Sequence, residues 1–203
     1  MSLTQLEWLA AATGIAGILT VLAYILWGLL LSLKRPLGTR TGSPEKIMNS
    51  AFYVVGGALY FALCFLTWRP IPVALSNSTR LAALTAGALL LYPGLALVAW
   101  GRHTLGEMYN VSSGFGVQLY KDQRLVTTGP FSIVRHPMYL GILLIALGGI
   151  LVYRTWTFVF LLANFPGLAR RAANEEQTLE LEFGEQWTEY CKRVPAWLPC
   201  LRR

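Results

Sequence analysis

Long apolar runs separated by short polar stretches dominate the pattern of hydrophobic and polar positions along this chain. The longer runs reach the roughly 20 residues that a helix needs to cross about 30 Å of hydrocarbon. They extend over residues 8–33, 47–68 and 81–101. Two shorter runs, 138–153 and 155–168, are separated only by Arg154 and predict a tight helical hairpin. The pattern therefore predicts an all-α, polytopic membrane bundle of about five transmembrane helices.

The pattern also favours a single integral membrane domain over residues 1–203, because no internal repeat or long flexible linker interrupts it. Residues 1–101 contain the three long runs, and residues 102–203 contain the short runs together with nearly all of the candidate chemistry. Hydrophobic residues make up 55% of the chain and charged residues 13%, which is typical of a membrane protein. Nothing in the pattern indicates an oligomeric state.

The basic residues are distributed unequally between the polar stretches. Of the 17 basic residues, all but three follow the first, third or fifth run, and the exceptions are Arg69, Arg80 and Arg154. The positive-inside rule then predicts an external N-terminus, and it places the C-terminus and the polar segments after the first, third and fifth runs on the cytoplasmic side. The first run has no basic residues before it, so we expect a retained helix rather than a cleaved signal. The net charge of +7 is a topological signal and does not predict nucleic-acid binding.

Polar residues directly precede an apolar helix in the stretch LVTTGPFSIVRHPMYL, residues 125–140. Pro137 suits the first turn of that helix, because the N–H that proline lacks would have no partner there. Proline also biases the preceding residue, His136, away from helical geometry. The free N–H groups at a helix start favour an anion, and Arg135 and His136 lie immediately before them. The stretch therefore predicts an anion-binding site at the membrane surface.

Two further polar segments contain the remaining candidates. Residues 102–135 form a connection longer than an idle loop usually is, and the turn-rich part at 111–117 favours a small hairpin or an irregular cap. Residues 171–193 place Glu175 and Glu176 just beyond the fifth run. Apolar residues then recur at helical spacing and predict one face of an amphipathic helix: Leu179, Phe183, Trp187 and Tyr190.

Metal binding is not indicated by the sequence. His103 and Glu107 are four residues apart, but two such groups make a weak site, and we expect ordinary surface hydrogen bonding there. Cys64, Cys191 and Cys200 have neither metal-like spacing nor an even number for disulfide pairing.

Three separated elements resemble the isoprenylcysteine carboxyl methyltransferase family of integral membrane methyltransferases, to which the phospholipid methyltransferases are related. They are LVTTGPFSIVRHPMYLG at 125–141, then Asn174-Glu175-Glu176, then the stretch FGEQWTEY at 183–190. The resemblance covers about residues 100–199. The RHPMY stretch alone also resembles larger membrane sterol reductases. The N-terminal helices carry no matching motif, so the resemblance does not extend to the choice of substrate.

The resemblance implies an S-adenosylmethionine site formed by the fourth and fifth helices, the Gly-Pro loop and the C-terminal segment. That cofactor presents a carboxylate, an ammonium, a sulfonium and an adenosine, so its site needs both signs of charge. We expect Arg135 and His136 to face the carboxylate, and Glu175 or Glu176 to face the ammonium. The full set of expected cofactor-binding residues is Gly129, Pro130, Arg135, His136, Pro137, Tyr139, Glu175 and Glu176.

Two of these residues have roles of a different kind. Gly129, beside Pro130, would let the backbone approach the cofactor, because glycine has no side chain to exclude it. Tyr139 would offer a π-face to the adenosine or to the sulfonium cation. The expected catalytic residues are Arg135, His136 and Glu176.

The expected reaction is direct methyl transfer to a lipophilic acceptor in the bilayer. A carboxylate acceptor, as in an isoprenylcysteine, needs no general base, whereas a phospholipid amine would need one, with His136 or a glutamate as the first candidates. Two other readings stay open. One is a non-catalytic lipid-binding protein, in which Arg135 only anchors the helix, His136 satisfies buried backbone and the glutamates form a solvated face. The other is a nicotinamide-dependent reductase, although no glycine fingerprint supports it.

Overall fold

The computed structural model describes residues 1–32, 37–40, 50–109, 118–120 and 122–198. Its helices are α1 (Leu3–Ser32), α2 (Ser50–Leu66), α3 (Asn77–Leu105), α4 (Pro137–Tyr153), α5 (Trp156–Ala163), α6 (Phe165–Phe183) and α7 (Glu185–Arg193). Short 3₁₀ turns lie at Gly106–Met108 and Gly129–Ser132, and the strands are β1 (Leu37–Arg40) and β2 (Gln118–Tyr120). The helical framework that the apolar runs predict is therefore confirmed.

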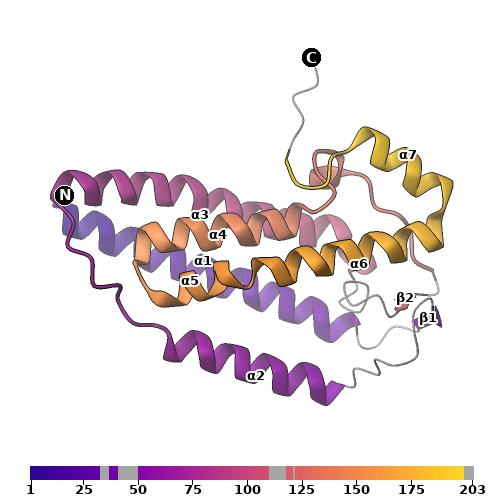
Figure 1. The fold of residues 1–203 in the computed structure, drawn as a ribbon, viewed down its shortest axis with the longest axis horizontal. Coiled ribbons are helices and arrows are strands. Elements are labelled where there is room, and N and C mark those ends of the chain that lie inside the picture. The colour runs from indigo at the N-terminus through magenta and orange to yellow at the C-terminus, as the bar shows by residue number, and fades with distance from the viewer. Residues whose placement is uncertain (33–36, 41–49, 110–117, 121, 199–203) are drawn as a thin grey trace.

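Helices α1, α3 and α4 lie side by side and form the core of the bundle, with α2 along its outer side (Figure 1). Small residues let α3 and α4 approach closely, because a Cβ added at Gly94 would lie 2.8 Å from the carbonyl oxygen of Gly141. The buried cluster between the helices contains Leu84, Leu91, Leu95 and Val152.

Two of the described helical stretches, Leu3–Leu31 and Asn77–Met108, are long and apolar enough to cross a membrane. Val55–Leu66 and Pro137–Tyr153 are apolar but shorter. A count of five spanning helices therefore stays a prediction. The helical hairpin at Arg154 is present, since α4 ends there in a left-handed C-cap with φ 50° and α5 begins at Trp156.

Charged side chains meet at the end of the bundle where α1 begins. Glu7 of α1 pairs with Arg80 of α3, and its Oε1 also lies 3.0 Å from Nη2 of Arg154. The backbone carbonyl of Arg69 accepts a hydrogen bond from the N–H of Trp156 at this same end. Arg69, Arg80 and Arg154, the three basic residues outside the predicted cytoplasmic set, thus lie at the same end of the bundle.

The fifth apolar run does not form a single helix over 155–168, and that prediction is wrong. Helix α5 ends at Ala163, and α6 begins at Phe165 with Pro166 in its first turn. Proline cannot supply the N–H that would continue the helix, so the chain starts a new one. Helix α6 then extends to Phe183 and carries Glu175 and Glu176 toward the end of the bundle opposite Glu7.

The predicted single amphipathic helix is also wrong. Gly184 adopts a φ of 47°, ends α6 with a hydrogen bond from its N–H to the carbonyl of Glu180, and starts α7. Leu179 and Phe183 therefore lie on α6, whereas Trp187 and Tyr190 lie on α7. The four side chains nevertheless meet in one cluster, which also includes Val194 and Leu125.

The connection 102–135 also differs from its prediction. Helix α3 extends to Leu105, so Arg102 and His103 lie in its last turn rather than in a loop. Strand β2 pairs antiparallel with β1, with Leu37 opposite Tyr120, so its partner comes from the connection between α1 and α2 and not from a local hairpin. The turn-rich part at 111–117 lies outside the described residues.

Candidate functional site

A cavity of about 280 Å³ lies between the ends of the helices opposite Glu7. Its lining comes from α1, α3, the segment 123–126, α4, α6 and α7. Apolar side chains such as Ile25, Met138 and Ile142 share this lining with the charged Arg135, Arg171 and Glu175, as well as with His136 and Tyr139. The cavity therefore offers both signs of charge next to an apolar surface.

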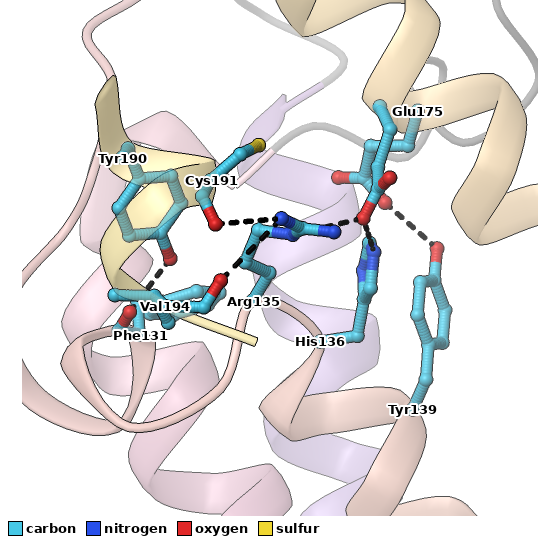
Figure 2. A network of polar contacts seen from close by, with 9 residues as sticks. Phe131, Arg135, His136, Tyr139, Glu175, Tyr190, Cys191 and Val194 are labelled. Carbon is cyan, nitrogen blue, oxygen red and sulfur yellow. Dashed lines mark hydrogen bonds and ion pairs between the residues drawn. The ribbon is translucent and has the colours of Figure 1, made fainter. Parts of the chain in front are cut away.

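The loop before α4 is held in place by the C-terminal segment. The N–H of Arg135 donates to the carbonyl of Pro195 at 2.8 Å, and the N–H of His136 donates to that of Ala196 at 3.1 Å. The hydroxyl of Tyr190 donates to the carbonyl of Phe131 at 2.6 Å (Figure 2). His136 has φ −119° and ψ 58°, and α4 begins at Pro137. Both backbone predictions for this motif are confirmed.

One carboxylate oxygen joins the two polar residues of the motif. Oε1 of Glu176 accepts a hydrogen bond from Nε of Arg135 at 3.1 Å and from Nε2 of His136 at 2.7 Å. An ionised carboxylate can only accept, so His136 presents Nε2–H to it. The His136 side chain is only 5% exposed and that of Glu176 is 28% exposed, so the imidazole is shielded from water while the carboxylate stays partly hydrated.

The environment of Glu176 keeps this carboxyl group ionised. Partial burial raises the pKa of Glu176. The hydrogen bond from His136 and the charge of Arg135 together lower that pKa by more than burial raises it, so it lies below its ordinary value. Arg135 makes weaker contacts as well: Nη1 lies 3.5 Å from the carbonyl of Cys191 and 3.4 Å from that of Val194. The guanidinium also stands 5.7 Å from the centre of the Trp187 ring.

Glu175 plays a different part from its neighbour. Its Oε2 accepts a hydrogen bond from the hydroxyl of Tyr139 at 3.0 Å, and Figure 2 shows the Tyr139 side chain pointing toward the helix that carries Glu175. Glu175 lines the cavity, as does Arg171 one turn earlier on α6, whereas Glu176 does not. Of the adjacent pair, one carboxylate thus faces the cavity and the other holds Arg135 and His136.

Gly129 and Pro130 do not line the cavity. Gly129 has a φ of 59°, and a Cβ at this position would lie 2.8 Å from the Thr104 hydroxyl oxygen of α3. Glycine is therefore needed here for the left-handed turn and for packing against α3. Pro130 is fully buried beside it. The cofactor contact expected of these two residues stays a prediction.

Sequence reasoning missed three contributors to the site. Trp197 stacks near His136, with ring centres 5.2 Å apart, yet no motif or periodicity marks this residue. Arg171 lines the cavity but has the appearance of a topological anchor in the sequence. Trp187 lies under Arg135, and its place in the apolar stripe predicts packing alone. The i, i+4 spacing of Arg171 and Glu175 on one helix face was the available signal.

The fold and the site define a helical membrane protein with a cavity lined by charged and aromatic side chains at one end of its bundle. The family to which the chain belongs is that of the phospholipid methyltransferases, whose family model matches residues 82–186. That match extends from α3 into α7 and includes the motif at 125–140 as well as Glu175 and Glu176.

Individual relatives carry several activities in their names. The chain is 35% identical over 83 residues to protein-S-isoprenylcysteine O-methyltransferase of Schizosaccharomyces pombe, covering 40% of this chain and 35% of that protein. It is 30% identical over 156 residues to methanethiol S-methyltransferase 2 of Bradyrhizobium diazoefficiens, covering 73% of this chain and 59% of that protein. It is also 37% identical over 76 residues to a delta(14)-sterol reductase of Mus musculus, covering 36% of this chain and 18% of that protein. The matched parts thus span less than two thirds of each relative.

Proposed function

We propose that this protein is an integral membrane methyltransferase that transfers the methyl group of S-adenosylmethionine to a lipophilic acceptor. The observation that carries the proposal is the cavity in which Arg135, His136, Tyr139 and Glu175 converge within the region that matches the family model. The relatives named as O- and S-methyltransferases support the same chemistry.

The chemistry of the lining fits this cofactor. Glu175 offers a carboxylate for an ammonium group, and Arg171 and Arg135 offer guanidinium groups for a carboxylate. Arg135 uses Nε and Nη1 within the protein, and a guanidinium has five N–H donors, so donors remain for a ligand. The cavity volume of about 280 Å³ is near the lower end of ligand sites, which span roughly 300–1,000 Å³.

The residues of the site would hold, orient and desolvate the reactants. S-adenosylmethionine would supply an electrophilic methyl group on a sulfonium. An anionic acceptor such as a carboxylate needs no base, so alignment within the cavity is the principal task of the protein. The sulfonium and an anionic acceptor both lose charge as the methyl group is transferred, so the transition state needs less solvation than the reactants. The shielded surroundings of His136 would therefore favour the reaction. An amine acceptor would need a base, and since Nε2 of His136 bears a proton toward Glu176, the basic lone pair would be on Nδ1.

The membrane arrangement is part of the proposal. Five spanning helices would place the N-terminus outside and the cavity on the cytoplasmic side. The grouping of Arg69, Arg80 and Arg154 at the end of the bundle opposite the cavity supports this orientation. The apolar lining at Ile25, Met138 and Ile142 suits an acceptor delivered from the bilayer.

A thiol is the second candidate for the acceptor. The similarity to methanethiol S-methyltransferase 2 covers 73% of this chain, whereas that to the S. pombe isoprenylcysteine enzyme covers 40%. The longer match includes part of residues 1–101, because 73% of the chain is more than residues 102–203 alone. A thiolate, like a carboxylate, is an anionic nucleophile that needs no base once ionised.

The purified protein should be incubated with methyl-labelled S-adenosylmethionine and, in parallel, with an isoprenylcysteine analogue, a small thiol and a phosphatidylethanolamine. Label in one product, read by mass spectrometry, supports the proposal and selects the acceptor. A parallel titration with reduced nicotinamide cofactor tests the reductase reading. Binding of the nicotinamide without binding of S-adenosylmethionine would contradict the proposed function.

A further inference from the structure

Trp197 lies behind the site rather than in it. Its ring centre is 5.2 Å from that of His136 and 6.3 Å from that of Tyr139, and both of those rings line the cavity. Phe165, at the start of α6, packs edge-on against the Trp197 ring, with ring centres 5.4 Å apart. The indole therefore connects the start of α6 with two rings that border the cavity.

The backbone fixes where this indole lies. The carbonyls of Pro195 and Ala196, directly before Trp197, accept hydrogen bonds from the N–H groups of Arg135 and His136. The segment 195–197 and the loop 135–136 thus hold each other in register. The backbone that precedes Trp197 is therefore held beside the loop that carries His136, which places the indole next to the His136 ring.

The orientation of the His136 ring needs such support. The terminal torsion of histidine is broad, so a single hydrogen bond leaves the ring free to tilt. Glu176 fixes one edge of the ring through Nε2, at 2.7 Å, but contributes nothing to its faces. Trp197 and Tyr139 supply aromatic contacts at interplanar angles of 35° each. These two aromatic neighbours restrict the tilt of the ring that the hydrogen bond alone would allow.

We propose that Trp197 is a positioning residue that holds the His136 ring against Glu176 and toward the cavity. The kinetic consequence rests on the methyltransferase function proposed above, whereas the geometric one does not. Trp197 acts through His136 and does not itself contact the cavity. Its removal loosens the ring while leaving every lining residue in place.

The chain offers a direct test, because it contains only two histidines. Diethyl pyrocarbonate modifies accessible neutral imidazoles, and mass spectrometry of the peptides reports each histidine separately. His103 is exposed and serves as the internal standard, whereas His136 is only 5% exposed. The variants are Trp197→Ala, Trp197→Phe and, as a matched control, Leu198→Ala, whose side chain is 72% exposed.

We expect Trp197→Ala to raise the modification rate of His136 by roughly tenfold relative to His103, and to lower kcat by a similar factor. Trp197→Phe keeps an aromatic ring, so its His136 modification rate and its kcat should be close to those of the wild type. Leu198→Ala should change neither the modification rate nor kcat. Trp197→Leu, which keeps apolar volume, replaces the alanine variant if that variant does not fold. Unchanged His136 modification in the folded alanine or leucine variant would overturn the proposal, as would faster modification with unchanged kcat. Absence of wild-type methyl transfer to every acceptor would defeat the proposed function alone, and the modification rates would still decide the role of Trp197.

Discussion

Glu176 and His136 form a hydrogen bond of 2.7 Å between Oε1 and Nε2, across the junction of two elements that are far apart in the sequence. The same oxygen accepts from Nε of Arg135. The cation and the imidazole of one loop are therefore organised by a single carboxylate on α6. This arrangement makes Glu176 an organiser of the site, while Glu175 faces the cavity.

Replacing Glu176 with glutamine tests this organising role. The amide keeps the size of the side chain but removes the charge that holds Arg135 and His136. We expect binding of S-adenosylmethionine to weaken by about 1.5–3 kcal/mol, the range for hydrogen bonds to charged groups. Titration calorimetry on the purified protein measures this loss. Glu182→Gln, an exposed position on the same helix, is the control and should bind normally. Equal affinity in both variants would reduce Glu176 to a solvated helix face.

Acid should remove the stabilisation that Glu176 provides. Its pKa in the folded protein lies below the ordinary value of about 4.3, so the carboxylate stabilises the fold fully above that value. The stabilisation is lost as the pH falls through the lower, folded-state pKa. Melting temperatures of the wild type and Glu176→Gln in detergent should thus differ at pH 7 and converge toward pH 3. A difference that stays constant over this range would mean that the charge of Glu176 does not stabilise the fold.

The opposite end of the bundle should matter for stability and not for the site. Glu7→Gln breaks the charge pairing with Arg80 and Arg154, which joins α1, α3 and α4. We expect a small loss of stability, because the Arg80 and Arg154 side chains are 30% and 29% exposed and water can replace much of the lost pairing. Thermal unfolding in detergent measures the loss, and the affinity for S-adenosylmethionine should be unchanged at temperatures where the variant is folded. Weakened binding by the folded variant would indicate coupling between the two ends.

Orientation in the membrane can be tested with single cysteine reporters in a background whose native cysteines are replaced by serine. A reporter at Ser78, at the Glu7 end of α3, should react with a membrane-impermeant maleimide in sealed cells. A reporter at Gln186, exposed on α7, should react only after the cells are opened. Labelling of Gln186 in sealed cells would place the cavity on the external side.

The sequence predicts the local features of this protein well, because they depend on neighbouring residues. Apolar runs predict the helices, Pro137 predicts the start of α4, and the isolated basic residues predict which helix ends lie together. The breaks at Pro166 and Gly184 had visible signals as well, since both residue types end or restart helices. Hydrophobic spacing alone concealed them, because the apolar residues continue at helical intervals across Gly184.

The different positions of Glu175 and Glu176, and the contact of Trp197 with His136, were not predictable from the sequence. Glu175 and Glu176 are adjacent on a helix, so they point about 100° apart, and only the placement of α6 against α4 decides which one faces the cavity. Trp197 lies 61 residues from His136 along the chain, and the contact arises from backbone pairing of the C-terminal segment with the loop. Such contacts depend on tertiary packing, for which the local pattern carries no signal.

The central claim is that the cavity at Arg135, His136 and Glu175 is an S-adenosylmethionine site. Its most direct test is a calorimetric titration of the purified protein with S-adenosylmethionine, comparing the wild type with Arg135→Lys and His136→Ala. Lysine keeps the positive charge that topology requires but loses the planar fork that suits a carboxylate. We predict saturable wild-type binding that weakens in each folded variant by roughly tenfold, or about 1.4 kcal/mol. Absence of wild-type binding, or equal affinity in all three proteins, would contradict the account.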